Sequence, residues 1–273
     1  MRLLIFLLSA SACFGQLTIQ QMQPFFKGSG ATSVWYPTNA AEAMIYWFDT
    51  IPNPSFNSCR DSLTSGGGSI PTDGGNCLSL TNWVAPNGGN AVRNVGTPLY
   101  RASGGGNSGT TPRWDYNNGV SARFVTSGGL GNNIKWTNFT VIMVVGIAGA
   151  STANQGLCNN ANATPYLELN ASKLTMNAGS AISGAATIGN NPYIITWLQK
   201  GATSEIDTNG VLYVTGNSGT DGFALASDTP YLGQARVNHF TGTCSLFEMW
   251  TNTLSAGELS QEIARIKTNF GFP

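Results

Sequence analysis

The stretch Phe139-Thr140-Val141-Ile142-Met143-Val144-Val145 decides the fold class. It is the most hydrophobic strand-like run that follows the N-terminal segment. In an extended chain its apolar side chains occupy both faces, which is typical of a strand buried between two layers. We therefore predict an interior β-strand here.

Strand patterns continue on both sides of this run. Asn209-Gly210 favours a tight hairpin, because both residue types accept a positive φ. Asn170-Ala171-Ser172 is a second hairpin-like break. Short strands, turn signals and no alternating helices predict an all-β, antiparallel two-sheet jelly-roll sandwich. The other expected strands are Ala43–Phe48, Thr97–Ala102, Val120–Val125, Tyr166–Leu169, Lys173–Met176, Ile194–Leu198, Glu205–Asp207, Val211–Val214, Pro230–Gly233 and Ser245–Trp250.

One helix is predicted, at the C-terminal end. Ser255 and Glu258 have the spacing of a capping box, in which each side chain satisfies a free backbone N–H of the other. Gly271 is placed to end the helix. The apolar stripe consists of Leu259, Ile263, Ile266 and Phe270, and it predicts a short amphipathic helix packed across the sandwich.

The charge balance excludes some partners. Thirteen basic and thirteen acidic residues cancel, and charged residues are only 10% of the chain. A net charge near zero supplies no long-range field for nucleic acid or an anionic membrane. The chain holds 34 glycines, which fits short strands joined by many turns and favours a secreted binding or structural protein over a cytosolic enzyme.

The N-terminus predicts export. Arg2 is followed by the short apolar run Leu3–Leu8 and by small residues up to Gly15, the pattern of a secretory signal too short to span a bilayer. We expect residues 1–15 to be removed, 16–42 to form an irregular arm and 43–273 to form the sandwich. The alternative is lipidation of Cys13, in a loosely lipobox-like context.

Four cysteines remain after such a cleavage. In an oxidising compartment an even number predicts disulfides, with three possible connectivities. We expect Cys59–Cys77, which brackets a Gly/Ser-rich stretch, and Cys158–Cys244. A zinc site is disfavoured, since no Cys-x-x-Cys pair exists and His239 is the one histidine.

The order of motifs over residues 43–273 resembles the concanavalin A-like lectin/glucanase superfamily, in particular its laminin-G-like branch. The resemblance implies a jelly-roll sandwich, with glycan or protein binding in many members and catalysis in some. The aspartate that the branch carries in its first motif is absent. The motifs are Trp83–Asn90, Pro98-Leu99-Tyr100, Phe139-Thr140-Val141, Asn209-Gly210, Tyr231-Leu232-Gly233 and the closing segment Gly242–Ser255 with Glu258.

A catalytic reading is disfavoured. Laminarinase-type glucanases of the superfamily carry E-x-D-x-x-E, and the resembling stretch Glu205-Ile206-Asp207 has Gly210 at the last position. The mechanism needs a pair of carboxyl groups, so the acid pair is incomplete. His239 lacks a nearby nucleophile motif and is interpreted as a structural or surface histidine.

Aromatic residues in polar loops are the candidates for sugar stacking. Trp114 and Tyr116 are the first choice for an exposed platform, followed by Tyr100 and Trp83. Trp47, Trp197 and Trp250 lie in apolar strands and are expected between the sheets. Calcium is the cofactor that the superfamily would suggest; loop aspartates that could contribute are Asp73, Asp115, Asp221 and Asp228, with no assigned ligand set.

The sequence thus favours a secreted, non-catalytic binding or adhesion module for glycan or a surface polymer. The alternative is a structural subunit of an extracellular filament, coat or appendage, whose arm at 16–42 adds a strand to a neighbouring subunit. A glycoside hydrolase of the laminarinase type comes third.

Overall fold

A computed structural model describes residues 44–50, 57–64, 67–84, 90–116, 123–126, 135–148, 154–160, 164–224, 230–236 and 238–273. All of them belong to a unit that spans Trp35–Pro273. The expected signal segment, Cys13 and the arm at 16–42 lie outside the described residues. No described helix is long and apolar enough to cross a membrane.

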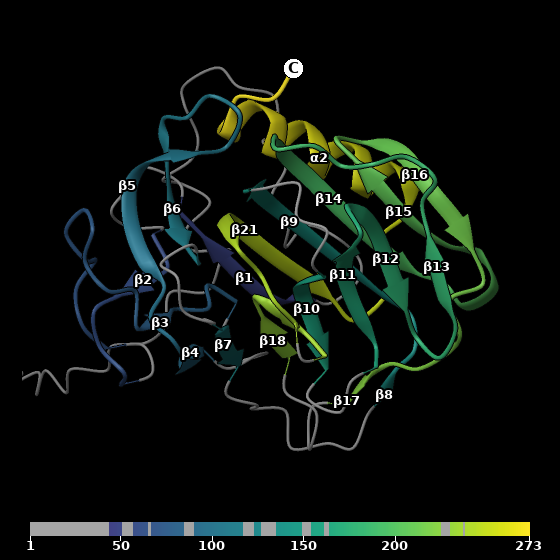
Figure 1. Ribbon diagram of the computed structural model, residues 1–273, viewed down its shortest axis with the longest axis horizontal. Helices are drawn as coiled ribbons and strands as arrows, with labels where there is room; N and C mark the ends of the chain where they lie inside the picture. Colours follow the sequence, from purple (N-terminus) through teal and green to yellow (C-terminus); the bar gives the residue numbers. More distant parts are fainter. Residues whose placement is uncertain are drawn as a thin grey trace, which may run out of the picture. The chain divides into compact units, whose positions relative to one another are not determined.

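The described strands form two large antiparallel sheets, as predicted (Figure 1). The eight-stranded sheet has, in spatial order, β16 (Val211–Gly216), β15 (Ser204–Thr208), β14 (Pro192–Gln199), β9 (Phe139–Ile147), β21 (Gly242–Trp250), β6 (Thr111–Asp115) and β5 (Leu99–Gly105), and β1 (Met44–Asp49) also pairs with β21. The nine-stranded sheet has β13 (Ala181–Ser183), β12 (Lys173–Asn177), β11 (Tyr166–Asn170), β10 (Gln155–Asn160), β18 (Pro230–Leu232), β7 (Arg123–Thr126), β4 (Ala91–Val95), β3 (Ser79–Leu80) and β2 (Cys59–Arg60). Two short pairs, β8 (Lys135–Trp136) with β17 (Phe223–Ala224) and β19 (Gln234–Ala235) with β20 (Asn238–His239), and the 3-10 helix η2 (Gly201–Thr203) complete the described elements apart from α2.

The main core lies between the two sheets. The predicted interior strand β9 is buried on both faces, and it pairs with β14 on one side and β21 on the other. Phe139, Trp197 and Phe223 meet edge to face, with ring centroids 4.7–6.2 Å apart. Such contacts add to the hydrophobic burial of the core and attach the short β8–β17 pair to the eight-stranded sheet.

The turns follow the predicted chemistry. Asn209 (φ 55°) and Gly210 (φ 81°) join β15 to β16, and Ala171 (φ 49°) with Ser172 (φ 64°) joins β11 to β12. Two successive residues with positive φ make a turn whose twist matches that of the flanking strands.

The C-terminal helix α2 (Ala256–Phe270) begins and ends as predicted. Its capping box at Ser255 and Glu258 is present, and Gly271 closes it in the left-handed conformation. Ile263, Ile266 and Phe270 are buried. The helix covers the side of the eight-stranded sheet that faces away from the nine-stranded sheet. On that side Arg265 of the helix pairs with Asp49 of β1 and Glu248 of β21.

The three strand tryptophans are buried on different sides of the eight-stranded sheet. Trp197 belongs to the core between the sheets, as predicted. Trp47 and Trp250 are buried but are not part of that core. Their strand neighbours Phe48 and Met249 face the core instead, so alternation along the strand turns both indoles to the helix side. The expectation that all three fill the space between the sheets is wrong for these two.

Candidate functional site

The first-choice aromatic residues do not form a surface platform. Trp114 is 0% exposed and Tyr116 is 2% exposed. The Trp114 indole Nε1–H donates to the Tyr116 hydroxyl at 3.0 Å, and the Tyr116 ring meets Phe124 and Phe240 edge to face. The expectation of exposure is wrong for both, because β6 pairs with β21 and turns these rings toward the core. A sugar ring has no access to them in this position.

The second-choice residues pin loops to the sandwich. Tyr100 is 7% exposed, and its hydroxyl accepts a hydrogen bond from Asn57 Nδ2 at 3.1 Å. Its predicted exposure is also wrong. Trp83 is half-buried, and the Arg60 guanidinium lies 5.9 Å from its ring centroid. A binding role for Trp83 stays a prediction.

The glucanase-like segment lies beside helix α2. Glu205 and Asp207 face away from the core while Ile206 is buried in it. Glu205 pairs with Lys200 at 3.3 Å. Burial, followed by the nearby Glu205 carboxylate, raises the pKa of Asp207. Position 210 holds a turn glycine, so this strand supplies no second glutamate there.

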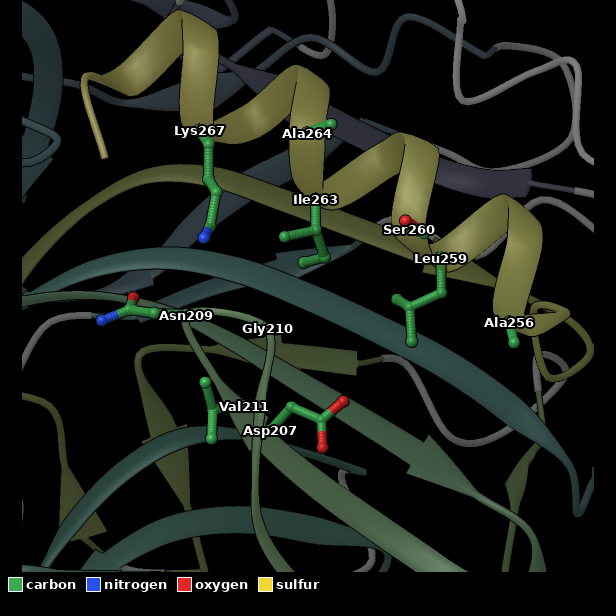
Figure 2. Close-up of a pocket in the computed structure, with 10 residues that line it drawn as sticks. All are labelled: Asp207, Asn209, Gly210, Val211, Ala256, Leu259, Ser260, Ile263, Ala264 and Lys267. Carbon is green, nitrogen blue, oxygen red and sulfur yellow. The ribbon is translucent and has the colours of Figure 1, made fainter. Parts of the chain in front are cut away.

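A cavity of about 460 Å³ separates that hairpin from the helix. Figure 2 shows Leu259, Ile263 and Lys267 projecting from the helix toward the hairpin residues Asp207 and Val211. Its helix side also includes Ala256, Ser260 and Ala264. The cavity offers an apolar wall with one cation and one carboxylate, and no aromatic ring for a sugar lies among its lining residues.

The candidate calcium ligands do not converge in the described parts of the chain. Asp73 accepts a hydrogen bond from the Ala102 amide at 2.9 Å, and Asp115 pairs with Arg113 at 3.7 Å. Asp221 accepts from Thr164 Oγ1 at 2.9 Å. Asp228 lies outside the described residues. No group of three or more histidine, cysteine or acidic side chains among the described residues could hold a metal ion.

The outer face of the nine-stranded sheet carries a polar row with two aromatic rings. Asn159 on β10 lies directly opposite Tyr166 on β11 and Tyr231 on β18. Directly opposed residues share one face of a sheet. The neighbouring Cys158, Leu167 and Leu232 belong to the core, so these three side chains point away from it. We call them the Tyr–Asn–Tyr row.

The centre of the row is an unused acceptor. Asn159 is 2% exposed, and its Oδ1 has no hydrogen-bond partner. Buried polar atoms are nearly always paired, and leaving one unpaired costs about 1–3 kcal/mol. Asn177 Nδ2 donates to the Tyr166 hydroxyl at 3.2 Å and extends the polar face. An amide oxygen between two tyrosines could accept a hydrogen bond from a ligand hydroxyl.

The β19–β20 hairpin stands on this face beside the row. Gly156 opposes the outward-facing Glu168, and a Cβ at Gly156 would lie 1.7 Å from the Ala235 amide nitrogen. Glycine therefore lets the hairpin backbone approach β10 directly. The hairpin in turn holds Asn238 Nδ2 3.4 Å from Glu168 Oε2.

Two arginine guanidinium groups lie over the tyrosine rings of the row. The Arg123 guanidinium carbon lies 4.4 Å from the Tyr231 ring centroid, and that of Arg236 lies 5.8 Å from the Tyr166 ring centroid. Burial raises the pKa of Glu168, and burial followed by the Arg123 charge lowers the pKa of His239. This face thus gathers stacked rings, cations and amides, which are the groups that recognise polar ligands.

Sequence reasoning identified the strands that carry Tyr166 and Tyr231, but it missed β10, which carries Asn159. Tyr166 and Glu168 alternate with the core residues Leu167 and Leu169, and Tyr231 precedes the core residue Leu232. That alternation is a readable signal that the tyrosines face outward. Their arrangement around Asn159 depends on strand pairing.

Comparison with known proteins gives the fold only. No protein-family model matches this chain, and no curated protein does. Among solved structures, domain 4 of the extracellular GH43 arabinanase AbnA from Geobacillus stearothermophilus, in complex with arabinotriose, is similar. The two chains are 14% identical, with a TM-score of 0.56, over 82% of this chain and 98% of that domain.

A sialidase from Trypanosoma rangeli, in complex with 2,3-difluorosialic acid, is also similar. It is 14% identical, with a TM-score of 0.51, over 74% of this chain and 34% of the sialidase. Both matches are sandwich-containing proteins solved with a sugar or sugar analogue, and neither is similar enough in sequence to transfer a site.

Proposed function

We propose that this protein is a secreted, non-catalytic module that binds glycan through the Tyr–Asn–Tyr row. The observation that carries the proposal is the unpaired Asn159 Oδ1 beside Tyr231, the partly exposed ring of the row, while Tyr166 on the other side is 6% exposed. Aromatic rings offer a flat apolar surface, and the amide offers hydrogen bonding, the combination that sugar recognition needs. The sugar-bound structures that share the fold support this choice. The signal-like N-terminus supports secretion.

The test is binding of the purified protein to a panel of oligosaccharides and polysaccharides, with and without calcium. We expect Tyr231→Ala to weaken binding of a positive panel member about tenfold, which corresponds to ~1.4 kcal/mol. Tyr231→Phe keeps the ring and should retain most of the affinity. Asn159→Ala should weaken binding by a similar factor, because one hydrogen bond contributes about 0.5–1.5 kcal/mol.

Trp114→Phe is the matched control, since Trp114 faces the core and should not touch the ligand. Thermal melts of each variant separate lost binding from lost folding. The proposal is refuted if folded wild-type protein binds no panel member. It is also refuted if Tyr231→Ala and Asn159→Ala both bind with the wild-type affinity.

A second candidate function is assembly with further copies of the chain. It is favoured by Val211 (68% exposed) and Leu212 (58% exposed) on β16, which ends the described order of the eight-stranded sheet. An edge strand presents backbone groups that can pair with another strand. We expect sedimentation velocity to show concentration-dependent oligomers that Val211→Lys disperses. A monomer at every concentration would exclude this role.

A further inference from the structure

Neither arginine on the candidate face forms a direct ion pair among the described residues, although Arg236 interacts electrostatically with Glu168. Arg123 donates to the neutral amide oxygens of Asn94 and Gln234, with Nε 2.8 Å from Asn94 Oδ1. Arg236 is exposed, and among the described residues its guanidinium forms no hydrogen bond or ion pair. Amide partners fix the direction of a guanidinium without neutralising it.

The acidic group on this face, Glu168, lies near enough to Arg236 for an electrostatic interaction but forms no ion pair with it. Glu168 is 1% exposed and lies beneath the β19–β20 hairpin, where Asn238 donates to it. Asp221 lies by the turn that follows β12, where Thr164 Oγ1 donates to it. Neither carboxylate forms an ion pair with Arg123 or Arg236.

The backbone conformation and hydrogen bonds of the β19–β20 hairpin fix the position of Arg236. Its backbone has φ 54°, a left-handed conformation that costs a non-glycine residue roughly 1–2 kcal/mol. Gln234 Nε2 donates to the Arg236 carbonyl at 2.5 Å, while the same Gln234 accepts from Arg123. One glutamine therefore connects both arginines, and the close approach at Gly156 holds the hairpin over the sheet.

The two cations lie at opposite ends of the row. Tyr166 and Tyr231 belong to strands on either side of β10, so their backbones are separated by roughly 10 Å. Arg123 already donates from Nε, Nη1 and Nη2 to Asn94 and Gln234, whereas the exposed Arg236 keeps the planar fork that matches a carboxylate. Between them, Asn159 Oδ1 can accept a hydrogen bond from a hydroxyl.

We infer that this face prefers saccharides whose units carry carboxylate groups, such as uronates or sialates. The inference rests on the proposed function and adds the charge of the ligand. A carboxylate would bind the fork of Arg236, with Arg123 supplying a second positive charge from its amide-held position, while a sugar hydroxyl donates to Asn159 Oδ1. Neutral saccharides would keep the stacking and the Asn159 contact but lose the charge-assisted hydrogen bonds.

Matched ligand pairs test this directly. The first pair is an oligogalacturonate and the same oligosaccharide with its carboxyl groups reduced to alcohols. The second pair is sialyllactose and lactose. Isothermal titration calorimetry would compare wild type, Arg236→Gln and Arg123→Gln, with Arg113→Gln as the control, because Arg113 lies on β6 in the other sheet.

We expect at least one acidic ligand to bind wild type about tenfold or more tightly than its neutral partner. Arg236→Gln should remove most of that preference, measured as the ratio of acidic to neutral affinity for the same variant. Raising salt from about 50 to 500 mM should reduce the preference, because it screens exposed charges. A preference within the oligogalacturonate pair would indicate uronate recognition, and a preference within the sialyllactose pair would indicate sialate recognition.

Three results would overturn the inference. Equal binding of both members of each pair would leave the proposed glycan-binding function standing and remove its acidic specificity. An acidic preference that survives both Arg236→Gln and Arg123→Gln would place the specificity elsewhere. Absence of binding to acidic and neutral ligands alike would overturn the proposed function as well. Arg236 is exposed, so loss of folding should not obscure its variant.

Discussion

Arg265→Met is expected to lower the free energy of unfolding by about 3–5 kcal/mol, because it removes the partner of buried carboxylates. The Arg265 side chain is 9% exposed, and it pairs with Glu248, Glu262 and Asp49, whose side chains are 0% exposed. The Glu248 contact is 2.5 Å and the Asp49 contact 3.8 Å. The same guanidinium lies 5.8 Å from the Trp47 ring centroid.

Three buried acidic side chains share the single cation of Arg265, so the stability of the cluster depends on this arginine. Burial, followed by the neighbouring Glu262 carboxylate, raises the pKa of Glu248 well above its usual value. Burial lowers the pKa of Arg265, but the carboxylates of Glu262 and Glu248 outweigh this effect and hold it above its usual value. Methionine would fill part of the space and leave three buried acids without a cation.

Urea denaturation of Arg265→Met beside Lys200→Met measures the effect. Lys200 forms a partly exposed pair with Glu205, with side chains 33% and 31% exposed, and such pairs contribute only about 0–1 kcal/mol. A loss below about 1 kcal/mol for Arg265→Met would show that the cluster does not stabilise the helix on the sheet.

Oxidised protein is expected to contain Cys59–Cys77 and Cys158–Cys244, and reducing both should cost several kcal/mol of stability. Within the described parts of the chain, four cysteines are buried and form no disulfide, so the two bonds remain predictions. Cys59 lies within hydrogen-bond reach of the Cys77 thiol. Burial raises the pKa of Cys244, and the nearby Cys158 thiol adds to that effect. A loop of about 20 residues corresponds to ~3 kcal/mol, and one of about 90 residues to ~4–5 kcal/mol.

The experiment must account for whether the cysteines are oxidised before or after folding buries them. Burial raises the pKa of Cys158 to about 12, so the folded protein offers almost no reactive thiolate there. Protein produced in an oxidising compartment should therefore be compared with protein produced in a reducing cytosol. Peptide mapping without reductant should recover the two expected pairs from the first preparation, and denaturation curves should give the stability difference. Alkylation of all four cysteines in unreduced, denatured protein would contradict the prediction.

Features set by neighbouring residues were predictable from the sequence. The buried strand β9, the Asn209-Gly210 turn and the capping box of α2 lie where the pattern predicts them. Each depends on side chains a few residues apart, because alternation and turn φ angles are local properties. β6 was missed because it includes Pro112 and follows a glycine-rich stretch, which disfavours a strand in sequence reasoning.

The side of the sheet to which each aromatic side chain points depends on the tertiary structure. Trp114 follows a polar, glycine-rich stretch in sequence, yet pairing of β6 with β21 puts it in the core. Trp47 and Trp250 were predictably buried, but only the packing of α2 shows that they lie on the helix side. The apolar character of a side chain predicts that it is buried. Which element buries it, the second sheet or helix α2, depends on how segments far apart in the sequence pack together.

The candidate site shows the same division most clearly. The sequence by itself shows that Tyr166 and Tyr231 alternate with apolar residues, and it predicts the tight turn at Asn209-Gly210. Only the tertiary structure places Tyr166 and Tyr231 on either side of Asn159, through the pairings of β10 with β11 and β18. The register of strands far apart in sequence depends on the packing of the whole sandwich, and a shift by one residue would turn this row into the core.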